Sequence, residues 1–541
     1  MARFNQRSTR PSVSSPVTTT GEKTRTYEGA TGHLRDAKSE LYLLAMSNMV
    51  GTDTFYEAGG DRDDRYTTLV RQLAVEDPAW TASLLGWLRA EANMRTAAIV
   101  GAAEFTKARL DAEEPGHSRH VIASVLRRAD EPGELLGYWT SRYGRRIPKP
   151  VKRGIEDALG SLYTERALLK YDTDSKGYRF GDVIELVHPA PKALWQGDLF
   201  EHAIDRRHHR DKPIPESLQL LHTRNEIAKW DVQKRRDLLK RPDAADFLNH
   251  AGMTWEALAG WLQGPMDKAA WEAIIPSMGL MALARNLRNF DEAGVSDAVA
   301  AQVCARFADP EQVGKSRMFP FRWWAAYKHA PSLRWAHALE QALGHSLANV
   351  PRLTGSTLIL VDRSPSMFPG YGFSTPNRSD ITLAEQAAVF GSALALRAEK
   401  PTLVEFGGDS KELTVPRGGS VLKLIEGYGQ IGGTDIPSAV KRHWFAHDRI
   451  VIVTDEQTRP GWLPSNMLGH GGMRETAIDD LVPKATPVYM WNMAGYKPGV
   501  MPSGKSGRHT FGGLTDQAFR MIPLLEQGRD ARWPWEDRPV A

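Results

Sequence analysis

From about residue 33 to residue 350, apolar residues recur mostly at every third or fourth position, the spacing of amphipathic α-helices. The first such stretch runs from His33 to Val50. Asp77 and Pro78 open the next one, since aspartate is a preferred helix cap and proline fits the first helical position. Further helices are predicted over 97–110, 118–128, 151–167, 180–187, 216–239, 254–262, 278–289, 296–307 and 332–347. Many short helices without intervening strands indicate a helical-repeat array, in which neighbouring pairs bury one another.

Near Pro351 the pattern changes, because strand-like apolar runs now alternate with helices. Strands are predicted over 357–361, 402–406, 450–453 and 487–491, and helices over 382–399, 419–427 and 436–446. This alternation is typical of a parallel sheet with crossover helices. We therefore expect a multidomain chain, with a helical domain over 26–350 and a doubly wound, Rossmann-like α/β domain over 351–541.

Composition narrows the class of protein. The 541 residues suggest two to four domains, and the net charge of +4 is too mild to imply nucleic acid by itself. Residues 1–25 are rich in Ser, Thr, Pro and Arg and are predicted to be a disordered tail. The start of the chain shows no secretory signal, and no run approaches 18 apolar residues. With a single cysteine, these features fit a cytoplasmic protein without a membrane partner.

A candidate metal site follows two of the predicted strands. The apolar run from Leu358 ends at Asp362, and two hydroxyl side chains follow at alternate positions. A second apolar run ends just before another aspartate, and a Gly-Gly turn precedes a threonine. Ligands of α/β sheets bind where such strands end, and carboxylate and hydroxyl oxygens suit Mg²⁺, Ca²⁺ or Mn²⁺. The candidate ligands are Asp362, Ser364, Ser366, Thr434 and Asp455. The plain alternative is serine capping in a solvated turn.

The order D-x-S-x-S, then G-G-T-D, then V-T-D resembles the metal-ion-dependent adhesion site of von Willebrand factor A domains, and the five candidate ligands match its positions. The resemblance implies one bound divalent cation, with Mg²⁺ as the expected ion. It also implies that a carboxylate from a partner protein can complete the coordination. The long loop from Phe368 to Asp380 either gates this site or is a surface insertion.

Basic residues concentrate in three stretches. The segment 142–153 holds six cations and no acid, the density that phosphate contacts require, although a solvated surface is the alternative. The second stretch is 206–210, and the third, 229–241, is diluted by acidic residues. His188 precedes a proline at the end of a predicted helix, where a histidine is more often structural than functional.

Several short motifs resemble, in the expected order, the TROVE module of telomerase, Ro and vault RNA-binding proteins. They are Thr26-Tyr27-Glu28-Gly29-Ala30, Thr52 to Tyr56, Asn93-Met94-Arg95, Leu186 to Pro189 and Trp271 to Met278. With the A-like domain behind it, the chain is similar to the Ro autoantigen family. That resemblance implies a monomeric ring of HEAT-like helical repeats closed by the A domain.

The resemblance also implies a function. Ro proteins bind small structured Y RNAs on the outer basic surface of the ring, and they pass the single-stranded 3′ end of defective RNA through its hole. Lys170 and His188 match family positions that matter for RNA binding, whereas the family's arginine four residues after the lysine is Asp174 here. Lys176 or Arg179 could replace that arginine. The expected RNA-binding residues are Arg142, Arg145, Arg146, Lys149, Lys152, Lys170, Arg179 and His188.

The leading hypothesis is a non-catalytic RNA-binding scaffold that acts in the stability or quality control of small noncoding RNA. The alternative is a metal-dependent interaction scaffold, whose cation captures an acidic residue of an exoribonuclease or another protein. A metal-dependent hydrolase is disfavoured because the two aspartates form one ion site rather than a two-metal clamp. Trp533 and Trp535 either seal the ring or pack on the A-like domain.

Overall fold

The computed structural model of the chain describes residues 13–47, 53–330, 332–368, 381–416, 419–464 and 473–536. They form two compact units. The α/β unit comprises Met1–Leu69, Phe319–Ala325 and Leu343–Ala541, and the helical unit comprises Val70–Met318 and Ala326–Ala342. The predicted combination of a large helical region with an α/β sheet is therefore confirmed. The ring form of the helical array stays a prediction.

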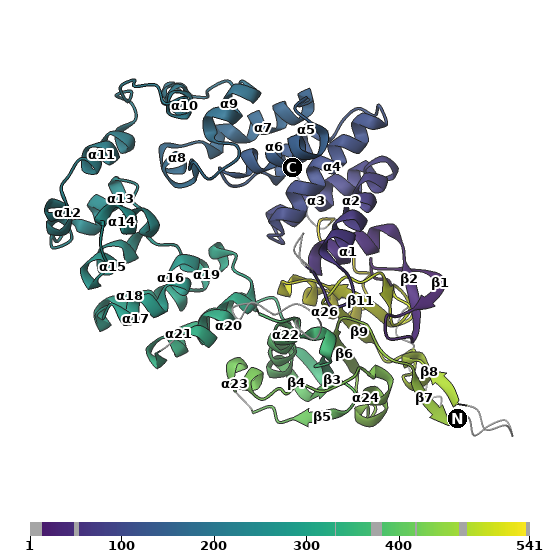
Figure 1. Cartoon of the computed structure of the whole chain (residues 1–541). Helices are drawn as coiled ribbons and strands as arrows, with labels where there is room; N and C mark the ends of the chain where they lie inside the picture. Colours follow the sequence, from purple (N-terminus) through teal and green to yellow (C-terminus); the bar gives the residue numbers. More distant parts are fainter. Residues whose placement is uncertain are drawn as a thin grey trace. The chain divides into compact units, whose positions relative to one another are not determined.

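The α/β unit is built on a six-stranded sheet with the order β11-β9-β6-β3-β4-β5, visible in Figure 1. Neighbouring strands run parallel except at the edge, where β5 is antiparallel to β4. The strands are β3 (Leu353–Asp362), β4 (Ala398–Phe406), β5 (Ser410–Leu413), β6 (Arg449–Thr454), β9 (Val488–Asn492) and β11 (Arg508–Gly512). Leu358–Val361 of β3 and Ile450–Val453 of β6 are continuous apolar runs because both faces of the sheet are covered there.

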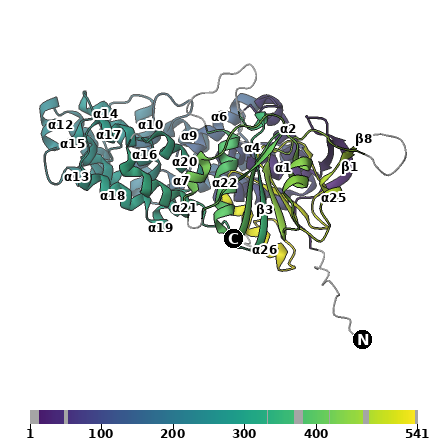
Figure 2. The same ribbon diagram turned by 90° about the horizontal axis from the view of Figure 1, so that it is seen from below.

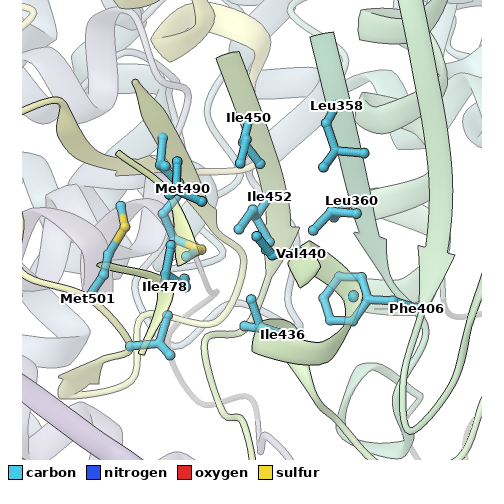
Figure 3. Packing of buried hydrophobic residues seen from close by; sticks show 14 of the residues in the cluster. Leu358, Leu360, Phe406, Ile436, Val440, Ile450, Ile452, Ile478, Met490 and Met501 are labelled. Carbon is cyan, nitrogen blue, oxygen red and sulfur yellow. The ribbon is translucent and has the colours of Figure 1, made fainter. Parts of the chain in front are cut away.

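Alternate residues of β3 point to opposite faces of the sheet. Leu358 and Leu360 belong to the apolar cluster that includes residues of α24 and α25, shown in Figure 3. On the other face α22 approaches so closely that a Cβ atom on Gly391 would lie 2.3 Å from a methyl of Val361. Figure 2 shows α22 and α25 on either side of the strands. The helices of this unit are α1 (Ala37–Ser47), α22 (Leu383–Arg397), α23 (Val421–Glu426), α24 (Ile436–His443), α25 (Ile478–Leu481) and α26 (Met521–Glu526).

The N-terminal residues belong to the α/β unit. Strand β1 (Thr19–Arg25) pairs with β2 (Thr31–Arg35), which in turn pairs with β10 (Pro498–Gly499). The expectation of a disordered tail is therefore wrong for residues 19–25, and residues 1–12 lie outside the described part of the chain. The compact units also depart from the expected boundary at residue 26, because residues 26–69 group with the sheet. Strand β1 is polar, and β2 depends on a second partner, β10, near the far end of the chain, so no local apolar pattern marks these strands.

The helical unit consists of short helices packed against near neighbours. For example, α5 and α9 both pack against α7. Its helices are α3 (Pro78–Ala90), α4 (Arg95–Asp111), α5 (Ser118–Val125), α6 (Glu131–Tyr143), α7 (Lys149–Leu162), α8 (Glu165–Tyr171), α9 (Phe180–Val187), α10 (Leu194–Arg207), α11 (Gln219–Ala228), α12 (Val232–Leu238), α13 (Ala244–His250), α14 (Trp255–Leu262), α15 (Lys268–Ile274), α16 (Leu280–Arg285), α17 (Leu287–Glu292), α18 (Asp297–Phe307) and α19 (Pro310–Ser316). Residues of α2 (Gly59–Glu76), α20 (Pro320–His329) and α21 (Ala336–Ser346) are divided between the two units.

Side-chain caps set the helix boundaries. The predicted cap is confirmed, since the Asp77 carboxylate accepts a hydrogen bond of 3.1 Å from the Trp80 amide. The helix expected over 151–167 is instead two helices, because the Thr164 hydroxyl caps α8. The helix expected over 216–239 is likewise divided, with Asp231 capping α12. Within the described residues, no helix has both the length and the apolar character needed to cross a bilayer.

Candidate functional site

The first candidate site lies where two neighbouring central strands end. From β3 the chain continues to β4 on one side and later returns to β6 on the other. Such a switch point opens a crevice at the carboxyl edge of the sheet, where ligands bind. Asp362 is the last residue of β3, and Asp455 directly follows the last residue of β6. Both side chains are fully buried.

Hydrogen bonds bring the predicted ligands together. One oxygen of the Asp362 carboxylate accepts a 2.8 Å bond from the Ser364 amide, and the other accepts a 2.5 Å bond from the Thr454 hydroxyl. The hydroxyl oxygens of Ser364 and Ser366 lie 3.1 Å apart. The Asp455 carboxylate accepts a 3.0 Å bond from the Gln457 amide. Asp455 lies close enough to Asp362 for the two charges to interact, so carboxylates from two strands and hydroxyls from one loop share a single buried site.

Thr434, the remaining predicted ligand, is also buried. It follows Gly433, whose φ of 72° requires the left-handed backbone region that glycine adopts readily. The Thr434 carbonyl accepts hydrogen bonds from the Arg459 amide (2.9 Å) and the Thr458 hydroxyl (3.2 Å). The threonine is thereby tied to the loop that follows β6 and carries Asp455.

The electrostatics of this site favour a cation. Burial raises the pKa of both carboxyls, and the nearby charge of Asp362 helps to raise that of Asp455 to about 8. One oxygen of Asp455 is buried and accepts no hydrogen bond from a described residue. Two buried carboxylates among hydroxyls match the oxygen ligands of Mg²⁺. The residues therefore fit a hard divalent cation. No cluster of three or more His, Cys, Asp or Glu side chains occurs among the described residues.

The second candidate site is the basic loop, defined as residues 142–153, at the junction of α6 and α7. Four of its cations are exposed and form no ion pair with a described residue: Arg145, Arg146, Lys149 and Arg153. Arg142 is exposed as well, but its guanidinium lies 3.1 Å from the buried Glu104 carboxylate. Lys152 is half-buried. The Trp139 indole donates a 3.3 Å hydrogen bond to the Arg146 carbonyl and anchors the loop.

The other two basic stretches are compensated by acids. Each of their principal cations has a carboxylate partner within 3.2 Å. The pairs are Arg206–Asp172, Arg207–Asp182, Arg210–Asp205, Lys229–Glu226, Arg236–Asp267 and Lys240–Asp237. Of the three stretches, the basic loop therefore keeps the most uncompensated positive charge.

Lys170 and His188 are both exposed. Lys170 lies in the last turn of α8, with its ammonium 5.1 Å from the ring centre of Tyr171. His188 ends α9 in the left-handed conformation, with φ 55° and ψ 55°. A histidine that closes a helix in this way has a structural role, and its exposure leaves the ring accessible to a ligand.

Arg179 was expected at the RNA surface, and its position argues against this. It is buried, and its guanidinium pairs with Asp172 at 2.7 Å and Asp174 at 2.6 Å. Both acids lie in residues 172–177, where Asp174 replaces the family's arginine, so Arg179 compensates them instead of reaching a ligand. Lys176, the other possible replacement, pairs with Asp130 at 3.3 Å. We therefore omit Arg179 from the proposed RNA surface.

Sequence reasoning missed two residues near the cation site, Glu28 and Tyr56. The Tyr56 hydroxyl donates a 2.6 Å hydrogen bond to one carboxylate oxygen of Glu28. The other oxygen accepts a 2.9 Å hydrogen bond from the Arg459 guanidinium. Both lie in motifs that were visible in the sequence, but no local signal places these motifs beside the sheet. The Trp533 and Trp535 rings lie 5.3 and 6.1 Å from the Tyr42 ring of α1, so they pack within the α/β unit. Residues 369–380 of the possible gating loop lie outside the described residues.

Comparisons with known proteins agree with this architecture. Residues 214–332 match the family model of the TROVE domain. No curated protein matches the chain. The crystal structure of the Deinococcus radiodurans Ro (RSR) protein is similar over 89% of this chain and 99% of that chain, with a TM-score of 0.56 and 16% identity. An identity this low shows the fold alone. Residues 214–332 are therefore similar to the TROVE domain, and the chain has the fold of the Deinococcus radiodurans Ro protein.

Proposed function

We propose that this protein is a non-catalytic RNA-binding protein that binds small structured noncoding RNA of the Y type. In this proposal it also binds single-stranded 3′ ends of misfolded RNA and acts in RNA stability or quality control. The TROVE domain and the Ro-like fold support the class of ligand. The observation that carries the proposal is the basic loop, four of whose exposed cations lack acidic partners among the described residues.

Phosphate recognition explains why unpaired cations matter. A cation already bonded to a carboxylate must give up that bond before it can contact a phosphate, whereas Arg145, Arg146 and Lys149 need not. Double-helical RNA is recognised mostly through its shape and its phosphates, so a basic loop on a helical scaffold suits it. Lys170 and His188 are exposed at the ends of α8 and α9 and would add contacts.

The test is to purify the protein from its host and sequence the RNA that accompanies it. We expect enrichment of a short, hairpin-rich RNA that is lost from the K170A/H188A variant. The K229A/K240A variant is a matched control, since both lysines are exposed but paired. RNA at background level with the wild-type protein would refute the proposal. Cleavage of the recovered RNA by purified protein with Mg²⁺ would refute its non-catalytic part.

A second candidate function is supported by the fit of the buried oxygen site to a divalent cation. Asp362, Ser364, Ser366, Thr434 and Asp455 would hold Mg²⁺, which would attract a carboxylate ligand. The partner would be an exoribonuclease or another protein that offers an acidic residue. In this case Asp362→Ala abolishes capture of the partner and leaves RNA affinity unchanged, which separates the two functions.

A further inference from the structure

Residues 26–28 of the N-terminal segment bind side by side to residues 457–459, the loop that follows β6. All three contacts are hydrogen bonds of 2.8–2.9 Å. They are Thr26 hydroxyl to Thr458 carbonyl, Tyr27 amide to Gln457 side-chain oxygen, and Arg459 guanidinium to Glu28 carboxylate. A segment from the start of the chain is thus docked on the carboxyl edge of the sheet.

The same loop is bonded to two of the candidate cation ligands. The backbone amide of Gln457 donates a 3.0 Å hydrogen bond to the Asp455 carboxylate, and the backbone amide of Arg459 donates a 2.9 Å bond to the Thr434 carbonyl. The N-terminal segment therefore contacts the residues that hold the site in place.

Tyr56 and Glu28 reach the site itself. The Tyr56 hydroxyl donates to Glu28 at 2.6 Å, and it lies close enough to the Ser366 hydroxyl and the Asp455 carboxylate for both groups to influence its pKa. The Tyr56 ring is held in place by stacking on Tyr27, with centroids 5.0 Å apart and planes at 4°.

Glu28 is an ionised group in this position. Burial raises the pKa of Glu28, but hydrogen bonds from Tyr56 and Arg459 outweigh this effect and bring the pKa below its usual value. Its side chain is only 23% exposed, whereas that of Arg459 is 63% exposed. A negative charge is therefore held beside the candidate cation site by an arginine at the surface.

We propose that the protein caps its own cation site, with the Glu28 carboxylate and the Tyr56 hydroxyl standing where an acidic residue of a partner would approach. This inference rests on the proposed cation site. Glu28 supplies the negative charge that a partner would otherwise bring, and the hydrogen bond from Arg459 holds the Glu28 carboxylate in place. The site then holds its cation without a partner, and an incoming carboxylate must displace Glu28 first.

The first test measures Mn²⁺ affinity of the full chain by electron paramagnetic resonance. Because groups just outside the ligands typically change metal affinity 10- to 100-fold, we expect Glu28→Gln to weaken Mn²⁺ binding about 10-fold. Glu475→Gln is the matched control and should leave the affinity unchanged, since Glu475 also binds the N-terminal segment, at Arg25 (3.0 Å). Equal affinities of Glu28→Gln and the wild type would overturn the cap.

The second test asks whether the site is open to carboxylates, with acetate as the probe. Acetate should leave the Mn²⁺ spectrum of the wild type unchanged and alter that of the E28Q/Y56F variant. An equal response of the wild type would show an open site and overturn the cap. If Asp362→Asn abolishes Mn²⁺ binding while Glu28→Gln does not change it, only the cap fails. If the wild type binds no Mn²⁺, the cation site and the cap fail together, and the RNA proposal stands.

Discussion

Salt dependence offers a sharp test of the basic loop as an RNA surface. The perturbation is the R145A/R146A/K149A variant, which removes three exposed cations that have no acidic partner among the described residues. Cations that contact phosphates release counterions on binding, so the logarithm of affinity falls linearly with the logarithm of salt concentration. If these three residues contact phosphates, the variant should have both a lower affinity and a shallower salt slope.

The magnitude follows from the number of contacts. At a slope of about 0.9 per phosphate, three contacts contribute a slope of about 2.7. Between 1 M salt and about 0.15 M this amounts to roughly two decades of affinity, or about 3 kcal/mol. The loss should be similar for any RNA duplex, since phosphate contacts carry no sequence information.

The assay is filter binding or fluorescence anisotropy with a hairpin RNA at a series of salt concentrations. The control is R210A/K229A/K240A, which also removes three charges. Those residues are paired with Asp205, Glu226 and Asp237, and their side chains are 52%, 64% and 70% exposed. The control should keep the wild-type slope. It therefore separates loss of a phosphate contact from a general change in net charge.

A wild-type slope for R145A/R146A/K149A would refute the reasoning, because uncompensated charge would then not mark the RNA surface. An equal fall in slope for both variants would also refute it. In that case the RNA would respond to net charge, and the ion pairs with Asp205, Glu226 and Asp237 would not keep these cations from contacting phosphates.

Three further predictions concern stability. Mg²⁺ at about 100 times its dissociation constant should raise the unfolding free energy of the wild type by about 2.7 kcal/mol in a thermal shift assay; an equal gain in Asp362→Asn would exclude the site. Arg35→Met leaves the Glu456 carboxylate buried without its 2.5 Å ion pair. The unfolding free energy measured with guanidinium should therefore fall by about 3–5 kcal/mol, and a fall of less than about 1 kcal/mol would contradict this. Burial raises the pKa of Asp130, but Arg128 and other cations lower it further, to about 2, below the ordinary value of 3.8. The Asp130 charge should therefore contribute about 2 kcal/mol to the unfolding free energy. This contribution is present above about pH 5 and is lost as the pH falls toward about 2. Urea unfolding should show the difference from Asp130→Asn shrinking over that range, and a constant difference would show that the charge of Asp130 does not stabilise the fold.

The elements with strong local signals were predicted well. Strand β6 and helix α9 follow from continuous apolar residues and 3.6-residue spacing, and both lie where the sequence indicated them. Strand β1 was missed because it is polar and owes its conformation to pairing with β2. The division at Thr164 was missed because an apolar spacing can continue across a cap.

The five candidate cation ligands could be selected from the sequence because each follows a strand end or a glycine turn. Their burial, and the two bonds that Asp362 accepts, required the assembled sheet. Glu28 and Tyr56 could not have been added, since they meet the site only after β2 has paired with the distant β10.

The sequence by itself determined the two kinds of architecture, the position of the basic loop and the residues that end β3 and β6. These properties depend on spacing along the chain, and spacing is fixed by the order of residues. Tertiary structure alone decided which charges are available. Arg145 and Arg179 are the same residue type, yet one is exposed without an acidic partner among the described residues and the other is buried between Asp172 and Asp174. Charge compensation and strand pairing depend on distances in space, which no local pattern fixes.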